Sequence, residues 1–150
     1  MFKPNMTVAC VVEAQGKFLL VEEKINGKHV LNQPAGHLEA NESLLEAAHR
    51  ELYEETGLFL SPQSIVGLYQ YPSMDEELTF LRLCFAISLQ KPVATAPKDA
   101  DILACHWLSP GEISQSGFQL RSPMVEQCIQ DYLAGASFPL TLYRQVISNG

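Results

Sequence analysis

The sequence predicts an α/β protein, and three features of the chain support this class. Apolar runs rich in Val, Ile, Leu and Phe occur in pairs separated by turn residues, which is typical of antiparallel strands. Residues 42 to 56 place apolar side chains three and four positions apart, as one face of a helix does. Residues 122 to 134 repeat that spacing and predict a second, packing helix. A chain of 150 residues is about the size of one domain, so we expect residues 1 to 150 to fold as a single domain.

The N-terminal part predicts a hairpin followed by a third extended piece. Residues 6 to 14 and 17 to 23 are apolar runs on either side of a Gln-Gly turn dipeptide at 15–16. Asn-Gly at 26–27 marks a second turn, because this dipeptide favours positive backbone angles. The piece that follows ends at Pro34 and delivers the chain to the central helix.

A second antiparallel pair is expected after the central helix. Residues 64 to 71 and 78 to 89 have the composition of strands, and the turn residues between them are Pro72, Ser73 and Asp75. In the longer run, one face holds Leu81, Leu83, Phe85, Ile87 and Leu89, so Arg82 points away from the most apolar face. Arg82 is therefore either a solvated strand residue or a guanidinium that projects into a site and contacts a phosphate.

The rest of the chain predicts a loop, a strand and a short helical turn. Residues 91 to 101 are rich in Pro and Ala, and residues 102 to 108 read as a short buried strand. Ser109 suits an N-cap and Pro110 the first helical position, so a helical turn should start there. We assign no chemistry to residues 136 to 150.

Charge and cysteine content exclude several kinds of partner. The formal net charge is −7 and Lys and Arg form no cluster, so neither nucleic acid nor an anionic membrane surface is expected to bind. No run approaches the ~18–20 apolar residues of a membrane span, and the N-terminus lacks the apolar core of a signal peptide. The four cysteines are far apart, which favours buried reduced thiols over a disulfide framework or a zinc site. We expect a cytoplasmic protein, either a monomer or a homodimer.

The central helix concentrates negative charge on one side. Glu51, Glu54 and Glu55 share a face, since neighbours three and four apart lie together, and no Lys or Arg follows before Arg82 to answer them locally. Gly57 is expected just past the helix end, which puts Glu54 and Glu55 in the last turn, where the helix dipole disfavours carboxylates. A solvated surface face is the ordinary explanation of such a charge run. A divalent cation would resolve both conflicts.

The other end and the buried side of this helix can also be predicted. Asn41 is the expected N-cap, and Glu42 is expected in the first turn, where a negative charge is favoured. The core-facing stripe consists of Leu45, Ala48 and Leu52.

The segment from Gly36 to Leu58 has the spacing of a known motif. Its fixed positions are Gly36, Glu42, Arg50, Glu51, Glu54, Glu55 and Gly57, with apolar residues at Leu52 and Leu58. Every one of these positions matches the signature of the Nudix hydrolases, and the chain therefore resembles that family. The resemblance implies an α/β/α sandwich with a mixed β-sheet, in which this segment forms a loop, a helix and a loop at the mouth.

The resemblance also implies a metal site. The expected ligands are the carbonyl of Gly36 and the carboxylates of Glu51, Glu54 and Glu55, which suit Mg²⁺, with Mn²⁺ as an alternative. Arg50 is four residues from Glu46 and would by itself read as a surface ion pair, whereas in the family it braces the carboxylates.

A carboxylate must also activate the attacking water. Glu51 is the first choice as base and Asp101 the second, because Asp101 stands where many family members supply a further carboxylate. Weaker candidates for that role are Asp99, Glu76 and Glu77. The predicted catalytic set is thus Arg50, Glu51, Glu54, Glu55 and Asp101, with Arg82 as a substrate-binding residue.

Within the family the chain resembles the NudJ-type phosphatases over residues 1 to 139. This branch acts on thiamine pyrophosphate, on the diphosphate of the hydroxymethylpyrimidine precursor, and on nucleoside di- and triphosphates. The resemblance implies a small-molecule pyrophosphate substrate and release of its terminal phosphate. Two alternatives stay open. One is an ADP-ribose pyrophosphatase, because Pro72 lies near that branch's diagnostic proline, and the other is a Nudix-like domain that binds a ligand without catalysis.

Overall fold

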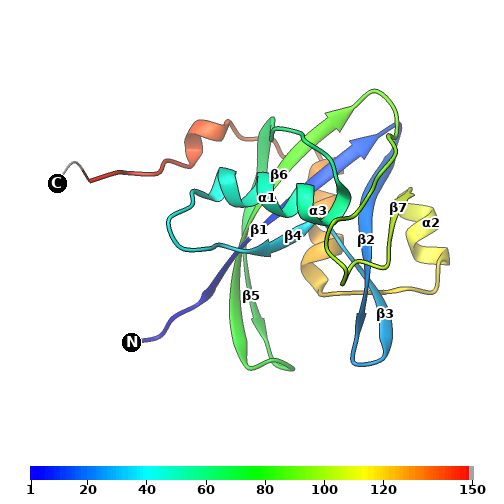
Figure 1. Ribbon diagram of the computed structural model, residues 1–150, viewed down its shortest axis with the longest axis horizontal. Helices are drawn as coiled ribbons and strands as arrows, with labels where there is room; N and C mark the ends of the chain where they lie inside the picture. Colours follow the sequence, from blue (N-terminus) through cyan, green and yellow to red (C-terminus); the bar gives the residue numbers. More distant parts are fainter. Residues whose placement is uncertain (149–150) are drawn as a thin grey trace.

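Two long strands lie side by side inside the sheet. In the computed structural model, which describes residues 1–148, β1 (Asn5–Ala14) pairs in parallel with β6 (Leu78–Leu89), with Asn5 opposite Phe80 and Ala14 opposite Leu89. On its other side β1 pairs antiparallel with β2 (Lys17–Ile25). The sheet is therefore mixed, as predicted (Figure 1). The predicted domain also includes residues 149 and 150, which lie outside the described part.

The remaining strands extend the sheet in both directions. The order β5-β6-β1-β2-β3-β8 adds β5 (Ser64–Ser73) at one edge, and β3 (Lys28–Asn32) with β8 (Gln119–Leu120) at the other. The short strand β4 (Ala35–His37) pairs with the start of β1, and β7 (Ala104–Leu108) pairs with β2. Because β4 pairs with β1, Gly36 lies directly opposite Val8.

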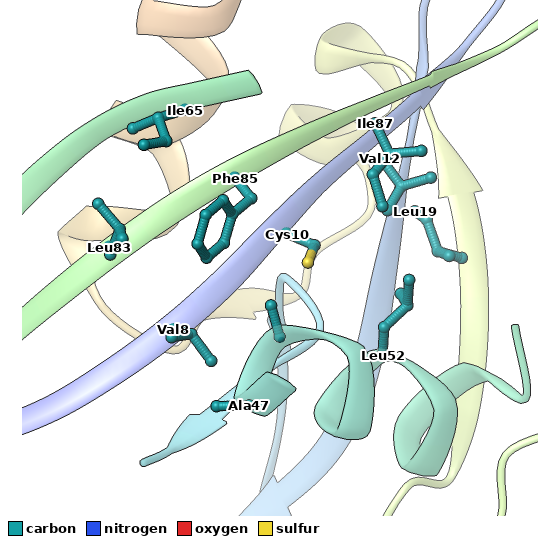
Figure 2. Packing of buried hydrophobic residues seen from close by; sticks show 11 residues of the cluster. Val8, Cys10, Val12, Leu19, Ala47, Leu52, Ile65, Leu83, Phe85 and Ile87 are labelled. Atoms are coloured by element: carbon teal, nitrogen blue, oxygen red, sulfur yellow. The ribbon is translucent and has the colours of Figure 1, made fainter. Parts of the chain in front are cut away.

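Helices cover both faces of the sheet, which confirms the α/β/α sandwich. Alternate side chains of β1 point to opposite faces: Val8, Cys10 and Val12 pack with α1 (Leu44–Thr56), as Figure 2 shows. Ala9 and Val11 belong to the cluster that α3 (Pro123–Leu133) completes through Cys128 and Ile129. The other helical segments are α2 (Pro110–Gln115), which starts at the predicted Ser109 N-cap, and the 3₁₀ turn η1 (Leu140–Leu142).

Two predicted hairpin turns are confirmed and a third is displaced. The turns at 15–16 and 26–27 adopt the expected positive φ angles, 53° and 79° in the first and 51° and 79° in the second. Pro72 and Ser73, predicted as turn residues, instead lie in β5, and the turn occupies residues 74–77. β5 is an edge strand, where a residue without an N–H group is tolerated, so the proline does not end it.

The start of α1 differs from the prediction. Asn41 has a φ of 65° and precedes the helix, whose N-cap is Ser43. Ser43 and Glu46 form a capping box, each side chain accepting the other's backbone N–H, which is why the serine is the better start. Glu42 is consequently outside the first turn. The hydroxyl of Tyr143 accepts the Leu44 N–H at 2.9 Å, so the tail also holds this end of the helix.

The cysteines are as predicted within residues 1–148. All four are free thiols; Cys10, Cys84 and Cys128 are buried, and Cys105 is half-buried. Burial raises the pKa of Cys10 to about 12, with the charge of Glu55 adding to the effect, which keeps this thiol protonated and inert. None of the helices in that range is long and apolar enough to cross a membrane.

Candidate active site

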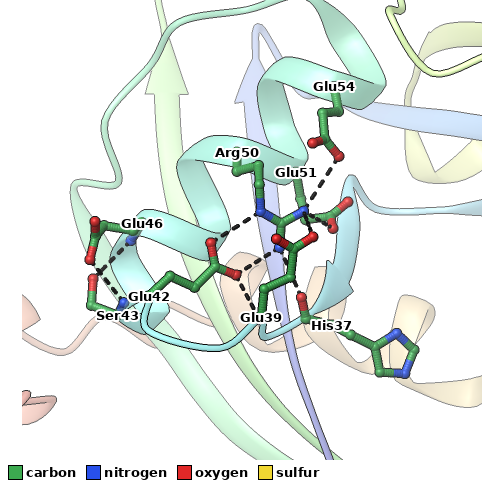
Figure 3. A network of polar contacts seen from close by, with 8 residues as sticks. All are labelled: His37, Glu39, Glu42, Ser43, Glu46, Arg50, Glu51 and Glu54. Atoms are coloured by element: carbon green, nitrogen blue, oxygen red, sulfur yellow. Dashed lines mark hydrogen bonds and ion pairs between the residues drawn. The ribbon is translucent and has the colours of Figure 1, made fainter.

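Arg50 lies at the centre of the acidic face of α1 (Figure 3). Its Nη1 donates to Glu51 Oε1 at 2.7 Å and more weakly to Glu54 Oε2 at 3.4 Å. Its Nε and Nη2 donate to the two carboxylate oxygens of Glu42 at 3.1 and 2.7 Å, a bidentate pair. The carboxylates nearby raise the pKa of Arg50, so its positive charge is permanent.

The same guanidinium ties the helix to the loop before it. Arg50 Nη2 donates to the carbonyl of His37 at 2.9 Å, and Nη1 lies 3.3 Å from Glu39. The surface pair with Glu46 does not form, because Glu46 is engaged in the capping box. Arg50 therefore braces the carboxylates, and its positive charge offsets the repulsion between them.

Glu51 presses against the backbone of β4. A Cβ built on Gly36 would lie 2.1 Å from Cδ of Glu51, far inside contact distance, so only glycine leaves room for this carboxylate. The Glu51 side chain is 13% exposed, and its burial raises its pKa, with Glu54 and Asp99 adding to the rise and Arg50 opposing it. The structure thus brings Glu51 and Gly36 together, and their role as metal ligands stays a prediction.

Glu55 is the most buried carboxylate of the helix, with 6% of the residue exposed. Its Oε1 accepts the N–H of Ala35, the neighbour of Gly36, at 2.9 Å. Burial, and to a smaller degree the carboxylates of Glu23, Glu51 and Asp99, raises its pKa to about 9 against the lowering effect of that N–H. Burial and neighbouring carboxylates favour the neutral form of this carboxyl, and a bound cation would favour the charged form.

Glu54 is more exposed than its neighbours. Its side chain is 43% exposed, and the hydrogen bond from Arg50 is its contact within the cluster. Across residues 1–148, no three His, Cys, Asp or Glu side chains are arranged so that they could hold a metal ion. Arg50 Nη1 instead donates to both Glu51 and Glu54.

The donor set nevertheless fits a hard divalent cation. Glu51, Glu54 and Glu55 offer carboxylate oxygens from one helix, and the absence of a side chain at Gly36 lets the Glu51 carboxylate lie against the backbone of β4. Oxygen donors of this kind suit Mg²⁺. The convergence of all four residues on one ion stays a prediction.

The loop of residues 91–101 is docked on the C-terminal end of α1. Three of its N–H groups donate to helix carbonyls at 2.8 Å: Ala96 to Thr56, and both Lys98 and Asp99 to Glu54. These bonds satisfy carbonyls that the helix end leaves free. Gly57 sits there with a φ of 75°, as predicted.

The two aspartates of this loop have different surroundings. Asp99, the weaker candidate, acts electrostatically on Glu51 and Glu55 and helps to raise the pKa of each. Asp101 is exposed, donates its N–H to the Asp99 carboxylate at 2.9 Å, and acts on the pKa of Glu23. Its role as a base stays a prediction.

The acidic cluster consists of Glu51, Glu54, Glu55, Asp99 and Glu23. Glu23 is the member that the sequence did not predict. Burial raises its pKa, Asp99 and Asp101 raise it further, and Arg121 opposes the rise. The signal was present in the alternation of β2, because Glu22 and Glu23 are adjacent and must point to opposite faces of the sheet. The side chain of one of these two glutamates therefore had to face the protein interior.

A cavity of about 200 Å³ opens beside these carboxylates. Gly36, Glu23 and Glu55 line it on the side of the acidic cluster, and it is also lined by Arg82 and Arg121. Glu76, another weaker candidate, lines it too, whereas Glu77 does not.

Arg82 is buried in this cavity, with 4% of the residue exposed, so the solvated-strand alternative is wrong. Its Nη1 donates to Gln33 Oε1 at 2.8 Å and its Nη2 to Asn32 Oδ1 at 3.1 Å, both neutral amide oxygens. Its Nε has no hydrogen-bond partner among the described residues. A buried guanidinium that no carboxylate neutralises favours an anion in the cavity.

Comparisons with known proteins show the family of this chain. Residues 1–128 match the family model described as the NUDIX domain. Phosphatase NudJ of Escherichia coli K12 is 53% identical over 142 residues, covering 95% of this chain and 92% of that protein. A NUDIX hydrolase from Nitrosomonas europaea has a TM-score of 0.86 at 40% identity, over 96% of this chain and 98% of the other.

A more distant structure shares the fold alone. The NUDIX domain of Shewanella oneidensis NrtR, solved in complex with ADP ribose, has a TM-score of 0.74 at 17% identity, over 89% of this chain and 90% of the other. The family match and the two closer likenesses cover nearly the whole chain. The chain belongs to the Nudix family and is a Nudix hydrolase.

Proposed function

We propose that this Nudix hydrolase is a Mg²⁺-dependent phosphatase that removes the terminal phosphate of small organic pyrophosphates. The observation that carries the proposal is the cavity that joins the acidic cluster to an unneutralised, buried guanidinium. A phosphate chain has negative charge for Arg82 and needs a cation to lie beside Glu55. Arg82 thus suits the charge of a phosphate, and the carboxylates of the cavity suit the cation that accompanies it.

Each residue of the site has its own proposed role. Glu51, Glu54, Glu55 and the Gly36 carbonyl would hold Mg²⁺, or Mn²⁺ in its place. When bound, the cation would neutralise phosphate charge and make a water molecule a better nucleophile at neutral pH. Arg50 keeps Glu51 and Glu42 in place through its hydrogen bonds. Either Glu51 or Asp101 accepts the proton of the attacking water, and Arg82 orients the phosphate.

The proposed substrates are those of the NudJ-type phosphatases, which this chain resembles. Thiamine pyrophosphate, hydroxymethylpyrimidine pyrophosphate and nucleoside di- and triphosphates all present a terminal phosphoryl group to attack. The identity of 53% to a protein named Phosphatase NudJ supports this class, in which orthophosphate is released. We place the activity in the cytoplasm, where the free thiols of the chain would stay reduced.

An ADP-ribose pyrophosphatase is the second candidate, favoured by the ADP-ribose complex of the NrtR domain, which shares the fold. The two candidates differ in the bond that breaks, because ADP-ribose has no terminal phosphate and must be cut internally.

Hydrolysis of thiamine pyrophosphate in ¹⁸O-labelled water separates these candidates. Attack on the terminal phosphorus should place the label in orthophosphate, and chelation of divalent metal should abolish release. Label in thiamine monophosphate, or a strong preference for ADP-ribose with AMP as product, would contradict terminal attack. A parallel reaction with product orthophosphate added to labelled water controls for exchange after release.

A further inference from the structure

A second arginine of the cavity is held differently from Arg82. Arg121 lies between β8 and α3, and its backbone N–H donates to the Leu31 carbonyl at 2.8 Å, which fixes its position. Its side chain makes a two-point ion pair with Glu76, at 2.9 Å from Nη2 to Oε1 and 3.5 Å from Nη1 to Oε2. Glu76 belongs to the turn between β5 and β6. The pair therefore joins two loops that are distant in the sequence.

The ion pair stands between two cavities. Arg121 and Glu76 line both the cavity of about 200 Å³ beside the acidic cluster and a neighbouring one of about 320 Å³, which Lys28 and Tyr71 also line. One side of the Arg121 guanidinium is thus available to a ligand in the inner cavity. Glu23 also lines the inner cavity, and the charge of Arg121 partly offsets the rise in the pKa of Glu23 that burial causes.

We propose that Arg121 is a second phosphate-binding residue and that Glu76 is the counter-ion a substrate must displace from it. This inference rests on the proposed function only in taking a phosphate chain as the ligand. Arg121 and Glu76 are 30% and 35% exposed in the side chain, so their pairing is weak and exchangeable. A phosphate carries more charge than a carboxylate and matches the guanidinium fork at least as well.

Arg82 and Arg121 have separate roles in binding the anion. Arg82 is buried and held by hydrogen bonds to Asn32 and Gln33. Arg121 is partly exposed and changes partner, so it sets how strongly the anion is held. Glu76 then acts as a specificity-determining residue, because it excludes ligands whose negative charge is too small to replace it.

If the ion pair has only a structural role, Glu76→Gln should have the opposite effect on ligand binding. If the pair only fastened the two loops, Glu76→Gln and Arg121→Gln would weaken ligand binding alike. If Glu76 competes with the ligand, Glu76→Gln should tighten binding by about 2- to 5-fold, the strength of an exposed ion pair. Arg121→Gln should weaken it by about tenfold, as loss of a charge-assisted hydrogen bond does.

The test uses the full chain and two measurements. Calorimetric titration with inorganic pyrophosphate in the presence of chelator gives Kd without turnover, and phosphate release from thiamine pyrophosphate with Mg²⁺ gives KM and kcat. Kd and KM should both fall in Glu76→Gln and both rise in Arg121→Gln. The matched control is Glu77→Gln, which removes the same charge from the same turn but from a residue that does not line the cavity.

Each outcome decides the proposal. Four results would overturn the proposal. They are a change of Kd in the same direction for both variants, no change of Kd, an equal gain in affinity in Glu77→Gln, and no binding of pyrophosphate to the unaltered protein. Tighter binding cannot result from damaged folding, so the Glu76→Gln result stands even if Arg121→Gln is destabilised. If no organic pyrophosphate is hydrolysed, the proposed function fails, while the titration still decides whether Arg121 binds the anion.

Discussion

Replacing Gly36 by alanine tests whether Glu51 must lie against β4. Gly36 does not have a positive φ, so the substitution strains no backbone angle, and the conflict is between the new Cβ and Glu51. The carboxylate carbon would have to retreat from 2.1 Å to an ordinary contact of 3.4 Å, a shift of 1.3 Å. Because Glu51 can rotate away, we expect the fold to survive with a loss of about 1–3 kcal/mol in the free energy of unfolding.

Activity should fall even though the protein stays folded. A displacement of about 1 Å in a catalytic group costs on the order of 100-fold in rate, so phosphate release should fall by about that factor. The assay pairs kcat/KM for thiamine pyrophosphate with urea denaturation. The matched control is Gly111→Ala, since the Cβ there would meet nothing nearer than 4.0 Å. Full activity in Gly36→Ala would refute the reasoning, as would an activity loss explained entirely by unfolding.

Two further perturbations follow from the charges of the structure. Glu54→Gln removes one proposed ligand charge from a 43% exposed side chain, so activity should fall by orders of magnitude while the urea midpoint stays equal or rises; equal activity would refute the ligand role. Hydrogen bonds first from His29 and then from His106 lower the pKa of Glu22. Glu22 therefore stabilises the fold above its unfolded pKa of ~4.3, and this contribution disappears as pH falls through the lower folded pKa. Glu22→Gln should flatten the loss of stability between about pH 5 and 3; an unchanged acid limb would contradict that assignment.

Sequence patterns predicted the features that depend on local spacing. The two faces of β6 follow from a period of two, and the end of α1 follows from Gly57, because only glycine adopts the left-handed angle freely. The closeness of Gly36 and Glu51 came from the family motif, and the packing of β4 on β1 explains it.

Features that depend on long-range contacts escaped prediction. Asn41 and Ser43 are both good N-caps, and the choice between them rests on Glu46 and on Tyr143 from the far end of the chain. The pair of Arg121 with Glu76 joins residues 45 positions apart, which no local pattern encodes. Glu23 lay within an apolar run, where its charge was visible but its surroundings were not.

The parallel pairing of β1 with β6 has a consequence for synthesis of the protein. β1 is made early, but Phe80, the partner of Asn5, follows only after the whole of α1 and β5. At a translation rate of ~5–20 residues per second, the apolar strand waits several seconds for that neighbour. During this interval the β1–β2 hairpin has an open edge of the kind that pairs with other chains. Nascent chains that end before Leu89 should therefore be the species that depend most on chaperones.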